Sequence, residues 1–343
     1  MNAPRLLITG GAGFVGSHLI RRLLTTTDAE VLNVDALTYA GNLDSLRDVE
    51  NSPRYRFLRQ DVRDAAGINA VYAEFRPDYA VNLAAESHVD RSIASPDIFV
   101  QTNIVGTFTM LEAGRAYWNS LPPDRRERFR FLHISTDEVY GSLGPADAPF
   151  CEETPYMPHN PYSASKAAAD HLVRTWHDTY GFPTLITNCS NNYGPFQYPE
   201  KLIPQTIARA LRGEPLTIHG DGKQIRDWLF VEDHVAAIQM ALERGRIGRS
   251  YLVAGENQYS VREVVDLICR MLDERRPLPN GSYRERIVSV ADRPGNDRRY
   301  AIDSSRIRCE LGWNRSVDFE EGLRRTVEWY LANESWLPTV PLF

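Results

Sequence analysis

The stretch Arg5-Leu-Leu-Ile-Thr-Gly10-Gly-Ala-Gly13-Phe-Val-Gly16 decides the fold of this chain. Its apolar start predicts a short buried strand, and residues 14–24 have the spacing of an amphipathic helix. The glycines between them permit a tight turn and close approach of the backbone to a pyrophosphate. The amino terminus of a helix attracts phosphates through its free N–H groups. Strand, glycine turn and helix in this order predict a dinucleotide-binding start.

Strands and helices continue to alternate through the first half of the chain. Further strands are expected at residues 31–35, 55–59, 79–83 and 129–135. This alternation predicts an α/β fold with a Rossmann-type, doubly wound parallel sheet. After residue 190 proline, glycine and aromatic residues become frequent and the units shorter. We expect residues 1–190 to form the cofactor-binding domain and residues 191–343 mainly a smaller α/β substrate-binding domain, with some later segments returning to the first.

Composition excludes several classes of protein. The 343 residues carry a net charge of −6, which disfavours nucleic-acid binding. The four cysteines are scattered, with no CxxC pair and no histidine cluster, so no metal site is expected. No apolar stretch resembles a signal peptide or a membrane span. These features favour a cytoplasmic protein with reduced thiols.

Asp35 ends the second expected strand and selects the cofactor. A carboxylate there accepts hydrogen bonds from the adenine ribose hydroxyls and repels a 2′-phosphate, which favours NAD over NADP. The alternative is that Asp35 is only a turn residue. Asp61 and Val62, after the third strand, are weaker candidates for contact with the adenine amino group.

Tyr162 and Lys166 form a candidate catalytic pair. Asn160-Pro161 is a helix-start signal, so the two residues lie four apart on one helix face. A nearby ammonium would lower the pKa of the tyrosine and make its phenolate a usable base. Taken alone, such a pair is also common on protein surfaces, and its position after a dinucleotide-binding start favours the catalytic interpretation.

Thr136, Asp137 and Glu138 follow the strand expected at 129–135. Removal of water from a substrate needs two proton-handling groups besides the tyrosine, and the two carboxyl groups are candidates. Adjacent residues on a strand point to opposite faces, so both can reach one substrate only if the chain turns at Asp137. The alternative is an exposed acidic turn.

These motifs together resemble the extended short-chain dehydrogenase/reductase superfamily and, within it, the nucleotide-sugar 4,6-dehydratases. Further segments carry the resemblance along nearly the whole chain: residues 35–42, 83–92, 135–141, 191–204, 220–230 and 292–300. Sister epimerases usually have small residues where Asp137 and Glu138 stand. One departure is Asn296, where the family often has histidine, and it leaves details of the nucleotide contacts open.

The resemblance implies an oxidation, a dehydration and a reduction within one sugar, by internal hydride transfer through tightly bound NAD. Tyr162 would take the proton of the carbon 4 hydroxyl, Thr136 would hydrogen-bond that hydroxyl, and Lys166 would hold the nicotinamide ribose. Glu138 would be the base at carbon 5 and Asp137 the acid for the hydroxyl leaving carbon 6. Spacing does not decide between the two carboxyl groups, so their roles rest on the resemblance.

The resemblance also implies two sets of binding residues. Expected at the cofactor are Gly10, Gly13, Phe14, Val15, Gly16, Asp35, Leu37, Thr38, Asp61, Val62, Leu83, Ala84, Ala85, Ser87, Thr102, Tyr162, Lys166 and Asn192. Expected at the substrate are Ser87, His88, Thr136, Asn191, Glu200, Lys201, Leu202, Arg226, Asn257, Arg293 and Tyr300. Arg226 suits a pyrophosphate because its guanidinium binds two oxygens at once.

The resemblance favours dTDP-glucose as the substrate and a homodimer formed by the Tyr162 helix and the helix around residues 106–117. The first alternative is an NAD-dependent nucleotide-sugar 4-epimerase, which would not need the acidic pair, or a 4,6-dehydratase of another nucleotide-hexose. The second is a non-catalytic module that senses dinucleotides. The sequence does not decide the nucleotide base from first principles, nor the pathway that the product enters.

Overall fold

Seven parallel strands form the central sheet of the protein. The computed structural model describes residues 3–292 and 294–337 and gives the strand order β10-β6-β5-β4-β1-β2-β3. The strands are β1 (Arg5–Thr9), β2 (Glu30–Asp35), β3 (Tyr55–Arg59), β4 (Tyr79–Asn82), β5 (Arg130–Thr136), β6 (Thr184–Cys189) and β10 (Ser250–Val253). The order reverses between β1 and β4, and ligands of such sheets bind at this point, beyond the carboxyl ends of the strands. The predicted Rossmann-type fold is confirmed.

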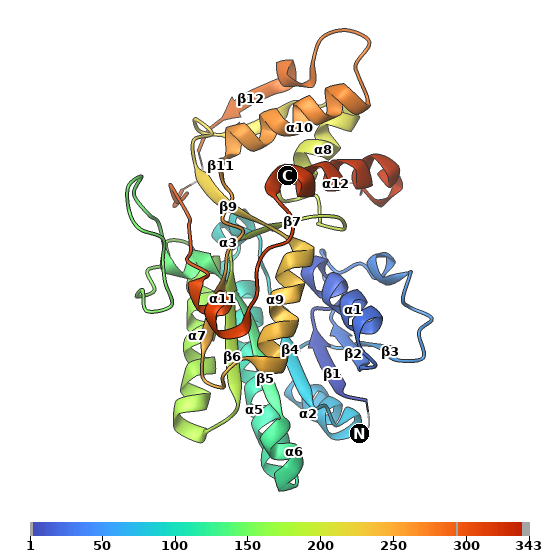
Figure 1. Ribbon diagram of the computed structural model, residues 1–343, viewed down its shortest axis with the longest axis vertical. Coiled ribbons are helices and arrows are strands. Elements are labelled where there is room, and N and C mark those ends of the chain that lie inside the picture. Colours follow the sequence, from blue (N-terminus) through green and yellow to red (C-terminus); the bar gives the residue numbers. More distant parts are fainter. Residues whose placement is uncertain (1–2, 293, 338–343) are drawn as a thin grey trace.

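Helices cover both faces of this sheet (Figure 1). One face carries α1 (Phe14–Thr26), α9 (Val231–Arg244) and α11 (Ser305–Leu311), and the other carries α2 (Ala65–Phe75), α5 (Gly106–Ser120) and α7 (Pro161–Tyr180). Side chains alternate along β1, so neighbouring residues pack on opposite faces of the sheet. Ile8 packs in the apolar cluster that includes residues of α1 and α9, and Leu7 in the cluster that includes residues of α2 and α5. Burial on both faces explains why the strands are almost continuously apolar.

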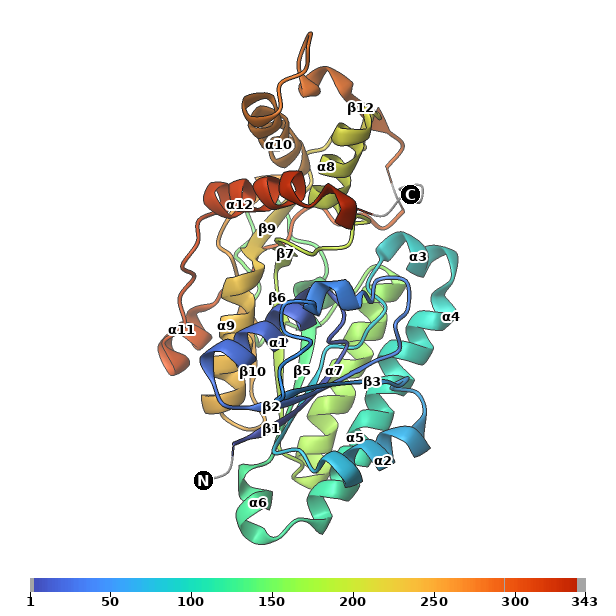
Figure 2. The same ribbon diagram turned by 90° about the vertical axis from the view of Figure 1, so that its right-hand side faces the viewer.

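Two smaller sheets and three helices form the other end of the molecule, as Figures 1 and 2 show. The sheets are β11 (Gln258–Ser260), β9 (Ile225–Phe230) and β7 (Asn191–Tyr193), and β12 (Ile287–Val290) with β8 (Leu216–His219). The helices are α8 (Leu202–Arg212), α10 (Val261–Arg275) and α12 (Phe319–Ala332). They enclose a separate apolar cluster that includes Tyr193, Ile268 and Phe319.

Three segments beyond residue 190 join the large sheet. Strand β10 pairs in parallel with β6, α9 packs against α1, and α11 packs against α9 and β10. The remaining short helical segments are η1 (Leu43–Leu46), α3 (Val89–Ala94), α4 (Pro96–Phe99), η2 (Val100–Val105), α6 (Pro123–Arg128), η3 (Asp137–Tyr140), η4 (Tyr283–Arg286) and η5 (Glu334–Trp336). Among the described residues, no helix combines the length and the apolar character that crossing a membrane requires.

Candidate active site

A cavity of about 1010 Å³ lies between the large sheet and the smaller region. Its wall includes the glycine turn, the carboxyl ends of β1, β2, β4, β5 and β6, and side chains from the second half of the chain. Ligand pockets are typically about 300 to 1,000 Å³, so this one is at the upper end of that range.

The glycine turn is shaped by close backbone contacts. Gly10 has a φ of +70°, and a Cβ on Gly16 would lie 2.3 Å from the Gly10 carbonyl oxygen. Gly13 begins α1, and no side chain among the described residues caps the helix there. The first N–H groups of α1 therefore remain available to a phosphate, and no acidic residue in the first turn opposes one.

Asp35 is buried at the end of β2, beside this turn. One of its carboxylate oxygens accepts from the Ala12 N–H at 2.9 Å and the other from the Leu37 N–H at 2.8 Å. Burial raises the pKa of Asp35, and these two hydrogen bonds oppose the rise. The glycine cradle, the uncapped helix and a carboxylate at the next strand end fit NAD.

The chain turns at the end of β5, as the acidic pair requires. Strand β5 ends at Thr136, and a 3₁₀ turn begins at Asp137. The Thr136 hydroxyl accepts from the Glu138 N–H at 3.2 Å and donates to Asp137 Oδ1 at 3.3 Å. Asp137 and Glu138 consequently both line the cavity, and the predicted turn is confirmed.

Asp137 is fully buried, and its charge state follows from its surroundings. Burial, then the charges of Glu138 and Asp227, raise the pKa of Asp137 well above its usual range, and Arg226 opposes the rise. Asp137 Oδ2 has no hydrogen-bond partner among the described residues. The surroundings of Asp137 therefore favour its neutral form, and Oδ2 is available to a ligand.

Tyr162 and Lys166 lie on the first two turns of α7. Asn160 caps the helix through a hydrogen bond from the Ser163 N–H at 2.9 Å, and Pro161 occupies the first turn, as predicted. Both side chains are buried and line the cavity. The helix start therefore places the pair beside the end of β5.

The predicted direction of the Tyr162 pKa is wrong. Burial, then the charge of Glu138, raise the pKa of Tyr162 well above its usual range, and its hydrogen bond with Thr136 opposes the rise. The Lys166 ammonium was expected to lower the Tyr162 pKa, but the Lys166 Nζ donates instead to the Ile134 carbonyl at 2.8 Å. The physical reason is that burial outweighs a cation that is held by the backbone.

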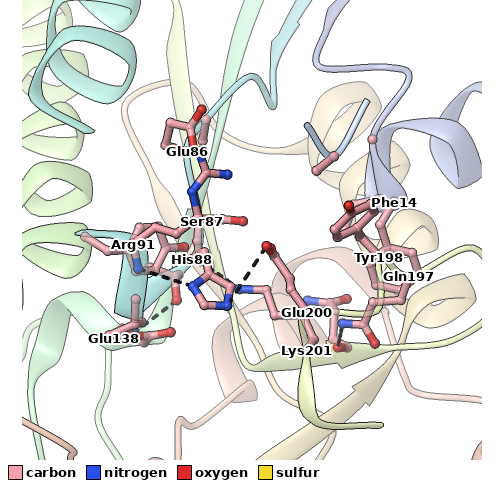
Figure 3. Close-up of a pocket in the computed structure, with 18 of the residues that line it drawn as sticks. Phe14, Glu86, Ser87, His88, Arg91, Glu138, Gln197, Tyr198, Glu200 and Lys201 are labelled. Carbon is pink, nitrogen blue, oxygen red and sulfur yellow. Dashed lines mark hydrogen bonds and ion pairs between the residues drawn. The ribbon is translucent and has the colours of Figure 1, made fainter. Parts of the chain in front are cut away.

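His88, Glu200 and Lys201 lie close together in the cavity wall (Figure 3). His88 Nε2 lies 4.0 Å from Glu200 Oε2, and Lys201 Nζ donates to the Ser87 carbonyl at 2.7 Å. Tyr39 donates to Glu200 Oε1 at 3.1 Å. These contacts connect the segment after β2, which carries Tyr39, and the segment after β4 to the segment after β7.

Arg226 and Tyr300 form a second cluster in the wall. The Arg226 guanidinium lies 4.3 Å from the centre of the Tyr300 ring and donates to Asn296 Oδ1 at 3.1 Å. Tyr300 donates to Asp297, whose other carboxylate oxygen lies 2.6 Å from His159 Nδ1. Asn296, at the position where the resemblance expects histidine, thus orients Arg226.

The structure brings most of the predicted binding residues together. Lining the cavity are Gly10, Gly13, Phe14, Val15, Gly16, Asp35, Thr38, Asp61, Val62, Leu83, Ala84, Ala85, Ser87, His88, Thr102, Thr136, Asn191, Asn192, Glu200, Lys201, Leu202, Arg226 and Tyr300. Leu37 and Asn257 do not line it. Leu37 has a φ of 53° and gives only its N–H to Asp35, and Asn257 bonds to Asp227 and to the Trp228 carbonyl. Arg293 lies outside the described residues.

Sequence reasoning missed several residues of this cavity. Cys189 ends β6 in the cavity wall, where burial raises the pKa of its thiol to about 12. Glu86 and Asp297 are buried in the same wall. The strand-end position of Cys189 is a signal that could have found it, because parallel strands end at the ligand edge. Asp297 has no such signal.

Comparison with known proteins identifies the class. The model of the family described as GDP-mannose 4,6 dehydratase matches residues 7–326. The chain belongs to this family of nucleotide-sugar dehydratases.

Relatives within the family are more specific. The chain is 54% identical to a dTDP-glucose 4,6-dehydratase from Neisseria meningitidis, over 98% of this chain and 96% of that one. It is also 54% identical to the dTDP-glucose 4,6-dehydratase of Salmonella typhimurium, over 98% and 95% of the two chains. The family resemblance inferred from the motifs is confirmed.

Solved structures agree with these relatives. A dTDP-glucose 4,6-dehydratase from Streptomyces venezuelae, solved with NAD bound, has a TM-score of 0.88 and 41% identity, covering 97% of this chain and 98% of that one. A UDP-glucose 4-epimerase from Thermotoga maritima has a TM-score of 0.83 but 28% identity, covering 96% and 99%. The fold is thus shared with epimerases, and the sequence is closer to the dehydratases.

Proposed function

We propose that this chain converts dTDP-glucose into its 4-keto-6-deoxy derivative with NAD as a resident cofactor. The observation that carries the proposal is the turn at residues 136–140, which presents the buried Asp137, whose pKa is raised, and a second carboxyl group beside Tyr162. An epimerase needs the tyrosine but has no use for two further proton-handling groups. The dehydratases at 54% identity support the same reaction.

The chemistry that bound NAD would supply is reversible hydride transfer, first from carbon 4 of the sugar and then to carbon 6. The glycine turn and α1 would hold its pyrophosphate, Asp35 its adenine ribose, and Lys166 its nicotinamide ribose.

The proton steps belong to side chains of this chain. Tyr162 removes the proton of the carbon 4 hydroxyl, while the Thr136 hydroxyl orients that group. Glu138 takes the proton from carbon 5, which the neighbouring ketone has made acidic. Asp137 gives its proton to the hydroxyl that leaves carbon 6, because burial raises its pKa and favours the protonated acid. Glu138 then returns its proton to carbon 5.

Arg226 and the Glu200–Lys201 segment would bind the diphosphate and the sugar. Arg226 lines the cavity with its guanidinium stacked on the Tyr300 ring, and this guanidinium is suited to two phosphate oxygens.

We further propose that the chain divides by function near residue 190, with α9 and β10 belonging to the cofactor-binding part.

We also propose a homodimer through α5 and α7. These helices pack side by side, and on their outer side Phe108 and Tyr180 are 45% and 46% exposed. Apolar rings at a helix pair are typical of a subunit contact. A Phe108→Glu variant should then halve the mass measured by light scattering.

A cytoplasmic location is part of the proposal and is supported by the four cysteines, which form no disulfide within the described residues.

Mass spectrometry tests the reaction directly. The purified protein is incubated separately with dTDP-, UDP-, CDP- and GDP-hexoses. Loss of one water from dTDP-glucose, without accumulation of NADH, supports the proposal. Loss of water from another donor alone corrects the nucleotide, and an unchanged mass with glucose converted to galactose contradicts the dehydration.

A further inference from the structure

Lys166 is surrounded by buried polar side chains that the proposed mechanism does not use. His133 lies on β5 and Asp170 lies one helical turn after Lys166 on α7. Both are fully buried, and neither is part of the cavity wall, whereas Lys166 is. A buried charge is costly unless it is paired, so the interactions among Lys166, His133 and Asp170 determine which of them carry a charge.

Three donors stabilise the ionised form of the Asp170 carboxylate, against burial, which raises its pKa. Its Oδ2 accepts from Ser135 Oγ at 2.8 Å, from the Tyr156 hydroxyl at 2.9 Å and from Asn188 Nδ2 at 3.0 Å. Its Oδ1 has no hydrogen-bond partner among the described residues and lies 3.5 Å from His133 Nε2. Hydrogen bonds to the charged form favour the carboxylate, so Asp170 supplies a negative charge beside Lys166.

A chain of hydrogen bonds fixes the proton on the His133 ring. The Thr9 hydroxyl accepts from the Ala84 N–H at 3.2 Å and therefore donates to Asn82 Oδ1 at 2.7 Å. Asn82 Nδ2 then faces His133 Nδ1 at 3.1 Å as a donor. His133 Nδ1 is consequently the acceptor, and the ring proton lies on Nε2.

His133 and Asp170 act on the Lys166 nitrogen in opposite directions. His133 Nε2 lies 3.2 Å from Lys166 Nζ, and an N–H at this distance stabilises the neutral amine, which has a lone pair to accept it. The Asp170 carboxylate stabilises the ammonium. Cys189 and Tyr162 are the other titratable groups near Lys166, and burial raises the pKa of both. Burial lowers the pKa of Lys166 to about 8, and Asp170 opposes this.

We propose that His133 and Asp170 are positioning residues that set whether Lys166 is an ammonium or an amine, and thereby the readiness of Tyr162 to give up its proton. Neither residue touches the cavity, so both act through Lys166. The inference rests on the proposed function, in which Tyr162 must become a base.

The composition of the chain makes a direct test possible. Lys166, Lys201 and Lys223 are the only lysines in the sequence. Protein labelled with ¹³C at the lysine ε-carbon should give three methylene signals, assigned with Lys201→Arg and Lys223→Arg. Their pH titration reports the charge of Lys166 in the purified protein, with its NAD content measured and without any sugar substrate.

Asp170→Asn should lower the midpoint of the Lys166 titration by about one pH unit or more, because an adjacent counter-charge is lost. Asp170→Glu should restore it in part. His133→Phe keeps a ring but removes the N–H, so it should raise the midpoint. If Asp170→Asn does not fold, Ser135→Ala, which removes one donor from Oδ2, should lower the midpoint by a smaller amount. The alkaline limb of the kcat profile should move with each midpoint.

Asp233→Asn is the matched control. Asp233 is also a buried helical carboxylate, and it accepts from Ser316 and Val317 far from Lys166. The control should cost stability without moving the Lys166 midpoint. An unmoved midpoint in Asp170→Asn, or a lowered one in His133→Phe, overturns the inference. If the wild type dehydrates none of the four hexose donors, the proposed function fails, but the titration still decides the roles of His133 and Asp170.

Discussion

The two walls of the cavity are built in different ways. The cofactor wall is made largely of backbone from one short stretch, Gly10 to Gly16, with Asp35 from the next strand. The opposite wall is made of side chains that are far apart in the sequence, such as Arg226 and Asn296, 70 residues apart. The shape of the cofactor wall depends on glycines that lack side chains, and the shape of the opposite wall depends on contacts between side chains. The two walls should therefore fail differently when they are altered.

The largest effect is expected from the pair of groups that move protons. Tyr162→Phe should lower kcat by about 10³-fold, within the range for loss of a general base. Asp137→Asn should lower dehydration by a similar factor while oxidation continues, so bound NADH should accumulate and absorb at 340 nm. Both variants should retain NAD, since neither alters the glycine turn. A loss of NAD from either would mean that the two walls are not independent.

The next effect concerns the cofactor wall. Gly16→Ala places a methyl group 2.3 Å from the Gly10 carbonyl oxygen, so the turn must shift. Overpacking of this kind costs about 1–3 kcal/mol. NAD retained per chain should fall by about tenfold, with a lower Tm. Gly181→Ala is the control: Gly181 has open space around it but a φ of +65°, so the variant should lower Tm and leave the NAD content unchanged.

A substitution at Asp137 is expected to raise stability, whereas Gly16→Ala lowers it. Its pKa is raised in the folded chain, so the folded state binds the proton more tightly than the unfolded state does. Stability is therefore lost as pH rises from about 4, the unfolded value, through the folded pKa, by about 1.4 kcal/mol per pH unit. Asp137→Asn removes this loss and should melt at a higher temperature than wild type at pH 8. At pH 5 the difference should shrink, and a constant difference would contradict the shift.

A moderate effect is expected at Arg226. Arg226→Lys retains the charge but loses the stacking on Tyr300 and the second nitrogen for a phosphate. We expect KM to rise by about tenfold with a small change in kcat. Arg298→Lys, an exposed arginine, serves as the control. An equal fall in kcat would show that Arg226 acts on the chemistry through Asp137.

The smallest effect is expected at His159. Its side chain is 41% exposed, while that of its partner Asp297 is 2% exposed, so the pair is partly screened by water. His159→Ala should raise KM by about threefold, because Asp297 still accepts from Tyr300. No change in KM would mean that Tyr300 alone orients this wall.

The sequence predicted the features that depend on local chemistry. The glycine turn, Asp35 at a strand end and the Asn160-Pro161 helix start follow from residues close together in the chain. The turn at Asp137 was predicted because two adjacent carboxyl groups cannot otherwise face one site.

The remainder depends on contacts between distant residues. Asn296 orients Arg226, and His133 lies against Lys166, because folding brings separate segments together. The pKa of Tyr162 was predicted in the wrong direction, since burial cannot be seen in the spacing of Tyr162 and Lys166. Side-chain pairing and desolvation are therefore the terms that sequence patterns do not contain.

The Thr136 hydroxyl has a consequence for how one catalytic cycle is followed by the next. The proposed product is a ketone at carbon 4, so each turnover leaves Tyr162 with one proton more and Asp137 with one fewer. Glu138 ends as it began. The Thr136 hydroxyl donates to Asp137 Oδ1 and also interacts with Tyr162, and a hydroxyl can accept one proton while it donates another. We therefore expect one proton to return from Tyr162 to Asp137 through Thr136 before the next turnover begins.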